Sequence, residues 1–158
     1  GRAGRLRTDS EAAGAQMSGS LILKTATRLL VSMILVFSVY LLLRGHNAPG
    51  GGFAGALVAG TGFALYAMAE GAASVRRAIS VDPRGLIVFG LILSVGTGLV
   101  AVFDGKAFLT GLWWTIAEFR DREIVIGTPF FFDVGVFAIV LGTILTIILA
   151  LEEDLEEA

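Results

Sequence analysis

Four long apolar runs dominate this sequence and restrict what it can fold into. Each approaches or exceeds the length that an α-helix needs, at about 1.5 Å per residue, to cross a hydrocarbon layer roughly 30 Å thick. The composition agrees, since 55% of the residues are hydrophobic, 16% are charged and mean hydropathy is +0.81. A soluble domain rarely reaches that balance. We therefore predict an all-α integral membrane protein, a bundle of four transmembrane helices at residues 21–43, 52–69, 85–103 and 134–151.

The two ends of the chain differ in composition from the membrane domain, which we place at residues 21–151. Residues 1–20 are polar and rich in small residues, and they lack the apolar stretch of a signal peptide, so we expect a disordered arm. Met17 lies shortly before the first apolar run and is an alternative start of the chain. Residues 152–158 are expected to form an exposed acidic tail.

A short glycine-rich break separates the first two predicted helices. Pro49 fixes its own φ and moves Ala48 away from helical geometry, so a helix should not continue through this point. Three glycines follow, at positions 50–52, and they let the backbone turn tightly and approach other segments closely. We expect a close-packed turn between two membrane helices.

The second predicted helix carries a stripe of small residues. Gly52, Gly55, Ala59 and Gly62 recur at spacings of three and four, which places them on one side of a helix. Small residues let two helix backbones approach each other in a membrane. We expect this stripe to dock the chain against neighbouring membrane subunits.

The region between the third and fourth helices, residues 107–129, is too short and too charged at its end to cross a membrane. Its paired tryptophans, Trp113 and Trp114, are typical of a segment at the membrane interface, where the ring is buried and the indole N–H stays hydrated. Asp133 then precedes the last apolar run and is a reasonable N-cap for that helix.

Positive charges predict the orientation of the four spans. One side carries eight of them, at Arg2, Arg5, Arg7, Lys24, Arg28, Arg76, Arg77 and Arg84. The other side carries four, at Arg44, Lys106, Arg120 and Arg122. Because positive residues stay preferentially in the cytoplasm, we expect both termini to be cytoplasmic and the chain to lie in the cell membrane.

Residues capable of chemistry are few. The chain has no cysteine and a single histidine, so it has no thiol site and no histidine metal cluster, and a net charge of −2 gives no case for nucleic acid. We find no nucleophile triad, paired-carboxylate motif or phosphate loop, and the ionisable residues lie at or near the ends of the predicted helices. These observations argue against an enzyme, a bound cofactor or metal, and a transporter that works alone.

Three residues are candidates for an ion path: Asp133, Glu70 and His46. Each has an ordinary structural alternative, as an N-cap, a solvated helix end and a hydrogen-bonded turn residue respectively. Arg28 either extends to the lipid headgroups or pairs with an acidic group or a lipid phosphate.

The glycine-rich segment 45–53, followed by segments 108–113, 127–129 and 132–136, resembles the B-type subunits of the Mrp-type (multiple resistance and pH) cation/proton antiporters. The resemblance covers roughly residues 21–151, and Ala56 stands where the family often has a glycine. The signature positions here are Pro49, Gly50, Gly51, Gly52, Phe53, Gly55, Gly127, Pro129 and Gly135.

The resemblance implies a small subunit of a hetero-oligomeric antiporter that exchanges cytoplasmic Na⁺ (in some members Li⁺ or K⁺) for external H⁺, without ATP. Its partners would be the other membrane subunits and the bilayer. Three alternatives stay open: a membrane subunit of a related hydrogenase or sulfur reductase complex, an integral membrane enzyme acting on lipid, and a purely structural subunit. The sequence does not specify the cation, the stoichiometry, the subunits contacted or whether any residue of this chain handles ions.

Overall fold

Four membrane-length helices account for most of the fold. The computed structural model describes residues 2–45, 49–119 and 122–156. Its elements are α1 (Arg2–Arg44), α2 (Gly52–Glu70), α3 (Ala72–Ala78), α4 (Pro83–Phe103), β1 (Trp113–Phe119), β2 (Arg122–Gly127) and α5 (Thr128–Glu156). The segments long and apolar enough to cross a membrane are Lys24–Arg44, Gly52–Glu70, Pro83–Phe103 and Thr128–Leu151. The prediction of a four-helix membrane protein is therefore confirmed.

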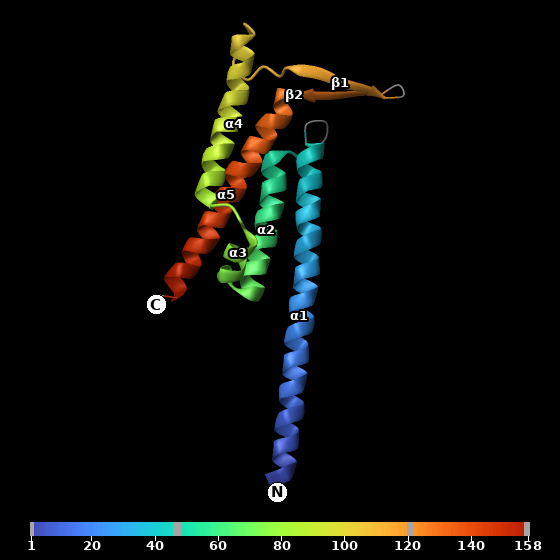
Figure 1. The fold of residues 1–158 in the computed structure, drawn as a ribbon, viewed down its shortest axis with the longest axis vertical. Helices are drawn as coiled ribbons and strands as arrows, with labels where there is room; N and C mark the ends of the chain where they lie inside the picture. The colour runs from blue at the N-terminus through green and yellow to red at the C-terminus, as the bar shows by residue number, and fades with distance from the viewer. Residues whose placement is uncertain (1, 46–48, 120–121, 157–158) are drawn as a thin grey trace.

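The four long helices lie side by side in the order α1, α2, α5, α4 (Figure 1). The main contacts join α1 to α2, α2 to α5, and α5 to α4, which makes α1 and α4 the outer members of an open row. Large apolar side chains on both outer helices remain exposed, such as Met33 on α1 (71% exposed) and Phe103 on α4 (89% exposed). Such a row leaves apolar faces that only lipid or other membrane proteins can cover.

The N-terminal part of the chain differs from the expected disordered arm. In the structure, residues 2–20 continue the first membrane helix, so that α1 begins at Arg2 instead of near residue 21 (Figure 1). Residues 2–17 include Arg, Leu, Glu, Ala, Gln and Met, which all have high helix propensity. Once a membrane helix has formed, extending it needs no new nucleation, so these residues can join it at low cost.

The glycine-rich break forms the turn between α1 and α2, as predicted. The Gly51 N–H donates to the Leu41 carbonyl oxygen at 3.1 Å, which folds the turn back onto the last turns of α1. Gly51 has φ +100°, a conformation that side-chain-bearing residues rarely adopt. Residues 46–48 lie outside the described part of the chain, and His46 with them.

A β-hairpin occupies much of the region between the third and fourth spans. β1 and β2 pair antiparallel, with Trp113 opposite Gly127 and an irregularity between Thr115 and Ala117. The β-branched residues of this region favour strands over helix. Trp113 and Trp114 are each about half exposed, at 50% and 49%. The strands are an addition to the prediction, which named only an interfacial segment.

The last helix begins earlier than predicted. α5 starts at Thr128, directly after β2, so Asp133 lies inside the helix and the prediction that it is the N-cap is wrong. The Leu112 N–H donates to Thr128 Oγ1 at 3.0 Å, and the Thr128 N–H donates to the Leu112 carbonyl oxygen at 2.9 Å. This reciprocal pair ties the base of the hairpin to the first residue of α5. Pro129 does not oppose this start, because the first turn of a helix tolerates proline.

The start of α4 lies deeper along α5 than the sequence indicated. A Cβ atom at Gly142 would lie 2.8 Å from the Pro83 carbonyl oxygen, so α4 begins beside Gly142. Gly142 is nine residues before Leu151, about 13 Å inside the apolar span of α5. Figure 1 shows the link rising from α3 to this point. Ile79 and Asp82 at the two ends of this link are extended, and four extended residues reach about 13 Å.

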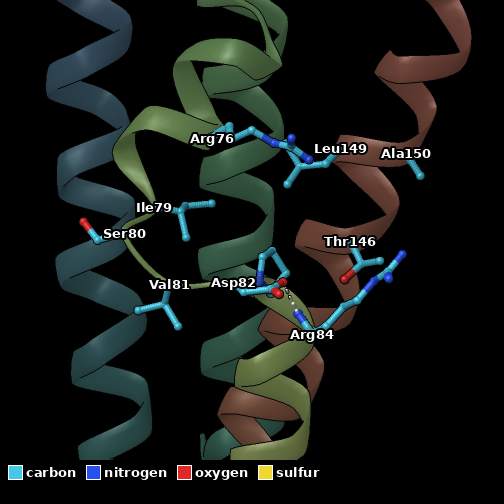
Figure 2. Close-up of a pocket in the computed structure, with 10 residues that line it drawn as sticks. Arg76, Ile79, Ser80, Val81, Asp82, Arg84, Thr146, Leu149 and Ala150 are labelled. Atoms are coloured by element: carbon cyan, nitrogen blue, oxygen red, sulfur yellow. Dashed lines mark hydrogen bonds between the residues drawn. The ribbon is translucent and has the colours of Figure 1, made fainter.

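The ionisable residues at the start of α4 lie at a helix end, as predicted. Asp82 is the N-cap of α4, and its Oδ1 accepts from the Arg84 N–H at 3.0 Å (Figure 2). Both residues therefore lie beside the middle of α5. The sequence showed a polar connection at this point, but it did not show which part of α5 the connection reaches.

Candidate functional site

Two of the family segments, 45–53 and 132–136, meet between α2 and α5. A Cβ atom at Gly51 would lie 3.4 Å from Asp133 Oδ2 and 3.6 Å from Oδ1, so the Asp133 carboxylate faces the turn. Gly52, the first residue of α2, packs directly on the Asp133 backbone carbonyl. Within the described part of the chain, no hydrogen bond to the Asp133 carboxylate is formed.

The Asp133 carboxylate also lies at the N-terminus of α2. The first N–H groups of a helix have no partner inside the helix, and the aligned peptide dipoles make this end positive. A carboxylate group at this turn can attract a cation.

Glycine is required at this crossing because the helix backbones touch. A Cβ atom at Gly55 would lie 2.8 Å from the Ser38 carbonyl oxygen of α1 and 3.4 Å from the Phe137 ring of α5. A Cβ atom at Gly62 would lie 3.1 Å from Ile34 of α1. Gly55 and Gly62 therefore let α2 pack between its neighbours at van der Waals distance.

These contacts correct the expected use of the small-residue stripe. Gly52, Gly55, Ala59 and Gly62 are buried within this chain, and Ala59 is only 1% exposed. The tight turn at Gly51 brings α1 alongside α2, and α5 covers the other side. The stripe therefore holds the subunit together and is not a free surface for a neighbour.

The family segment 132–136 also allows a close helix crossing, here between α4 and α5. A Cβ atom at Gly135 would lie 2.8 Å from the Gly90 carbonyl oxygen, and the Ser94 hydroxyl donates to the Phe132 carbonyl oxygen at 3.5 Å. The concentration of glycine and serine in the third predicted helix was a signal for this crossing, but it did not identify the partner helix. At Gly127, a Cβ atom would lie 2.6 Å from the Leu112 carbonyl oxygen, where the hairpin meets α5.

Glu70 lies at the opposite end of α2 in an ion pair with Arg28 of α1. Arg28 Nε is 2.6 Å from Glu70 Oε1, and Nη2 is 2.8 Å from Oε2, so both carboxylate oxygens are engaged. The Glu70 side chain is only 8% exposed, whereas that of Arg28 is 63% exposed. Tyr66 and Lys24 also lie near this carboxylate. Of the alternatives left open for Arg28, the structure shows the acidic partner.

The structure does not bring the predicted ion-path residues into one site. Asp133 lies at the first residue of α2 and Glu70 at the last, so about 27 Å of helix separates them. Both oxygens of Glu70 are engaged by Arg28, whereas among the described residues no hydrogen bond to the Asp133 carboxylate is formed. His46 lies outside the described residues. Asp133 is therefore the stronger of the two described candidates.

Comparison with known proteins identifies the family of this chain. A family model described as "Domain related to MnhB subunit of Na+/H+ antiporter" matches residues 22–146. The chain belongs to this MnhB family. The match includes the glycine turn, Asp133 and the α4–α5 crossing, and it excludes the first twenty-one residues and the acidic tail.

Curated relatives in the MnhB family match over nearly their full length. The Na(+)/H(+) antiporter B-type subunit of Alkalihalophilus pseudofirmus is 37% identical over 139 residues, which is 87% of this chain and 95% of the relative. The protein of the same name from Bacillus subtilis is 37% identical over 139 residues, covering 88% of this chain and 97% of the relative.

A solved structure shares the MnhB fold. A chain in "Structure of Mrp complex from Dietzia sp. DQ12-45-1b" matches with a TM-score of 0.70 and 38% identity over 86% of this chain. The match takes up 14% of that other chain, so in the Dietzia protein the same fold is one part of a much longer polypeptide.

Proposed function

We propose that this chain is the MnhB-type subunit of a multi-subunit antiporter that exchanges cytoplasmic Na⁺ for external H⁺ and is driven by the proton gradient. The observation that carries the proposal is the match to antiporter subunits of this type over 95% or more of their length. The chain acts as a transport component and not as an enzyme, with Na⁺ and H⁺ as the transported ions and no resident cofactor.

The open row of helices supports a role inside a larger complex. The exposed faces of α1 and α4 carry large apolar residues on both sides of the row. Neighbouring membrane subunits and lipid would cover them, in the way that the Dietzia chain joins this fold to further polypeptide. Because the small-residue stripe is used internally, these outer faces are the surfaces that we propose for contact with other subunits.

Within that complex, we propose that this chain lies beside an ion path. Asp133 is the candidate residue for attracting the cation, at the end of α2 that we place outside the cell, with the termini in the cytoplasm. His46 belongs to the same turn in sequence and is a candidate proton-handling residue. Glu70 stays a candidate at the cytoplasmic end, where its pair with Arg28 would have to open before it could bind an ion.

Genetic complementation in membrane vesicles tests this function. A host that lacks its own MnhB-type subunit receives this chain with the other subunits, and Na⁺-dependent proton movement is followed with a pH-sensitive dye. We expect exchange only when this chain and the other subunits are all present, and no exchange by the purified chain in liposomes. Sodium or proton transport by the chain alone would overturn the proposal, as would full exchange by the complex without it.

A further inference from the structure

An apolar stripe on α1 points away from the row of helices. Ser38 and Leu42 are buried on the side of α1 that packs against α2. On the opposite side of the helix, four residues recur at spacings of four, three and four, and each is at least half exposed. These residues are Leu29, Met33, Val36 and Tyr40. We call them the outer stripe of α1.

Tyr40 is held in a fixed position near the end of this stripe. The Arg44 guanidinium lies 5.9 Å from the centroid of the Tyr40 ring, and Arg44 Nη1 donates to the Tyr40 hydroxyl oxygen at 3.3 Å. The Phe37 ring stacks on the Tyr40 ring, with their centroids 6.1 Å apart. An exposed aromatic residue that is ordered in advance loses less entropy on binding, and tyrosine is enriched among the residues that dominate protein interfaces. Tyr40 therefore has the properties of an interface anchor.

The β-hairpin extends sideways over the same end of the row. Figure 1 shows it leaving the start of α5 and passing beyond the line of α1. The two strands pair with each other, and among the described residues the main contact of the hairpin with a helix is that of β2 with α5. A two-stranded hairpin is at best marginally stable unless it packs against another element. The part of the hairpin beyond α1 therefore needs support from outside this chain.

The register of the hairpin indicates the chemistry of that support. Glu118 is the register partner of Glu123, so two acidic residues occupy directly opposite positions on the two strands. Like charges at such positions destabilise a strand pair. A basic residue of a neighbouring protein would offset this repulsion, whereas the anionic phosphates of lipid headgroups would increase it. The hairpin is thus better suited to a protein partner than to a lipid surface.

We propose that the outer stripe of α1 and the hairpin together bind one transmembrane helix of a neighbouring subunit. The apolar side of that helix packs on the outer stripe, with Tyr40 as the anchor. A lysine or arginine at the end of that helix lies beside Glu118 and Glu123. This inference rests on the proposed function, which supplies the neighbouring membrane subunits, and it names one surface and one kind of partner.

Site-specific photocrosslinking in the assembled complex tests the surface. A photoreactive benzoylphenylalanine replaces Met33 on α1 or Val125 on β2, which lies two residues after Glu123 and so on the same face of the strand. We expect both positions to label the same subunit, in one transmembrane helix and the residues at its end. Ile92, exposed on α4 at the other end of the row, is the control position and should not label that helix.

Two crosslinking results would overturn the proposal: labelling of lipid alone from Met33, or labelling of different subunits from Met33 and Val125. Ion exchange is measured on the same samples. Exchange that persists while the two positions label different subunits would refute the shared surface and leave the proposed function intact.

A matched pair of double variants tests the charge contact. Glu118→Gln with Glu123→Gln removes the repulsion within the hairpin, so the unfolding temperature of the purified chain should not fall. The neighbour should nevertheless dissociate from the complex about tenfold more readily, because its basic residue loses both acidic partners. Glu152→Gln with Glu153→Gln removes the same two charges near the C-terminal end of α5 and should leave the complex unchanged. Equal dissociation of the two double variants, or a less stable chain after the hairpin changes, would contradict the charge contact.

Discussion

The Asp133 carboxylate faces the backbone of Gly51, with Oδ2 3.4 Å from the position that a Cβ atom would occupy. Eighty-one residues lie between the two in sequence, and the packing of α2 on α5 joins them. The contact places a carboxylate group beside the first residues of α2. At this contact the family segments 45–53 and 132–136 meet.

Replacing Asp133 tests whether its carboxylate group takes part in ion transport. Asp133→Asn keeps the size of the side chain and the backbone contact with Gly52, so the complex should still assemble. Na⁺-linked proton exchange in vesicles should fall about tenfold, equivalent to roughly 1.4 kcal/mol in the barrier, because an amide binds a cation poorly. The control is Asp104→Asn, which removes an exposed carboxylate paired with Lys106 at 2.9 Å. Unchanged exchange in Asp133→Asn would leave this residue with a purely structural role.

Enlarging a glycine of α2 should destabilise the subunit itself. Gly55→Leu forces a side chain into the Ser38 carbonyl oxygen and the Phe137 ring, and overpacking of this kind costs about 1–3 kcal/mol or more. We expect a lower unfolding temperature and loss of the complex on blue-native gels. Gly96→Leu is the matched control, because a Cβ atom at Gly96 has nothing within 4 Å. Intact complex with both variants would contradict the close crossing.

The pair between Arg28 and Glu70 should couple α1 to α2. Arg28→Gln leaves the nearly buried Glu70 carboxylate without its main partner, and Glu70→Gln removes the charge that holds Arg28. We expect each single variant to lower the unfolding temperature and the double variant to be no worse than either. The exposed pair of Lys106 and Asp104 supplies the control cycle, in which little coupling is expected. Additive losses at Arg28 and Glu70 would show that the two residues act independently.

The hydroxyl of Thr128 should hold the base of the hairpin. Thr128→Val preserves the shape of the side chain but leaves the buried Leu112 N–H without an acceptor, at a cost of about 1–3 kcal/mol. Thermal unfolding and hydrogen exchange at Leu112 measure the effect. Thr143→Val is the control, because the Thr143 hydroxyl is exposed and donates only to Ile139 in its own helix. Equal stability of the two variants would contradict the role of Thr128.

Much of the candidate site was predictable from sequence, but the contacts between its residues and other helices were not. Pro49 and the glycines at 50–52 indicated a turn because their backbone preferences are local. Asp133 stays a predicted candidate, whereas its predicted capping role is wrong, since α5 starts at Thr128, which bonds to Leu112. The partner of Glu70 lies 42 positions away on another helix, a separation that no local pattern encodes.

The sequence by itself determined that this chain crosses a membrane four times, because hydrophobic length and backbone propensity act locally. It also indicated the family, through short motifs in a fixed order. Only the tertiary structure decided that the helices form an open row, that the small-residue stripe is used inside the subunit, and that α4 begins beside the middle of α5. Those three features depend on which helix backbones pack so closely that no side chain fits between them. Contacts between segments far apart in the chain decide which backbones those are.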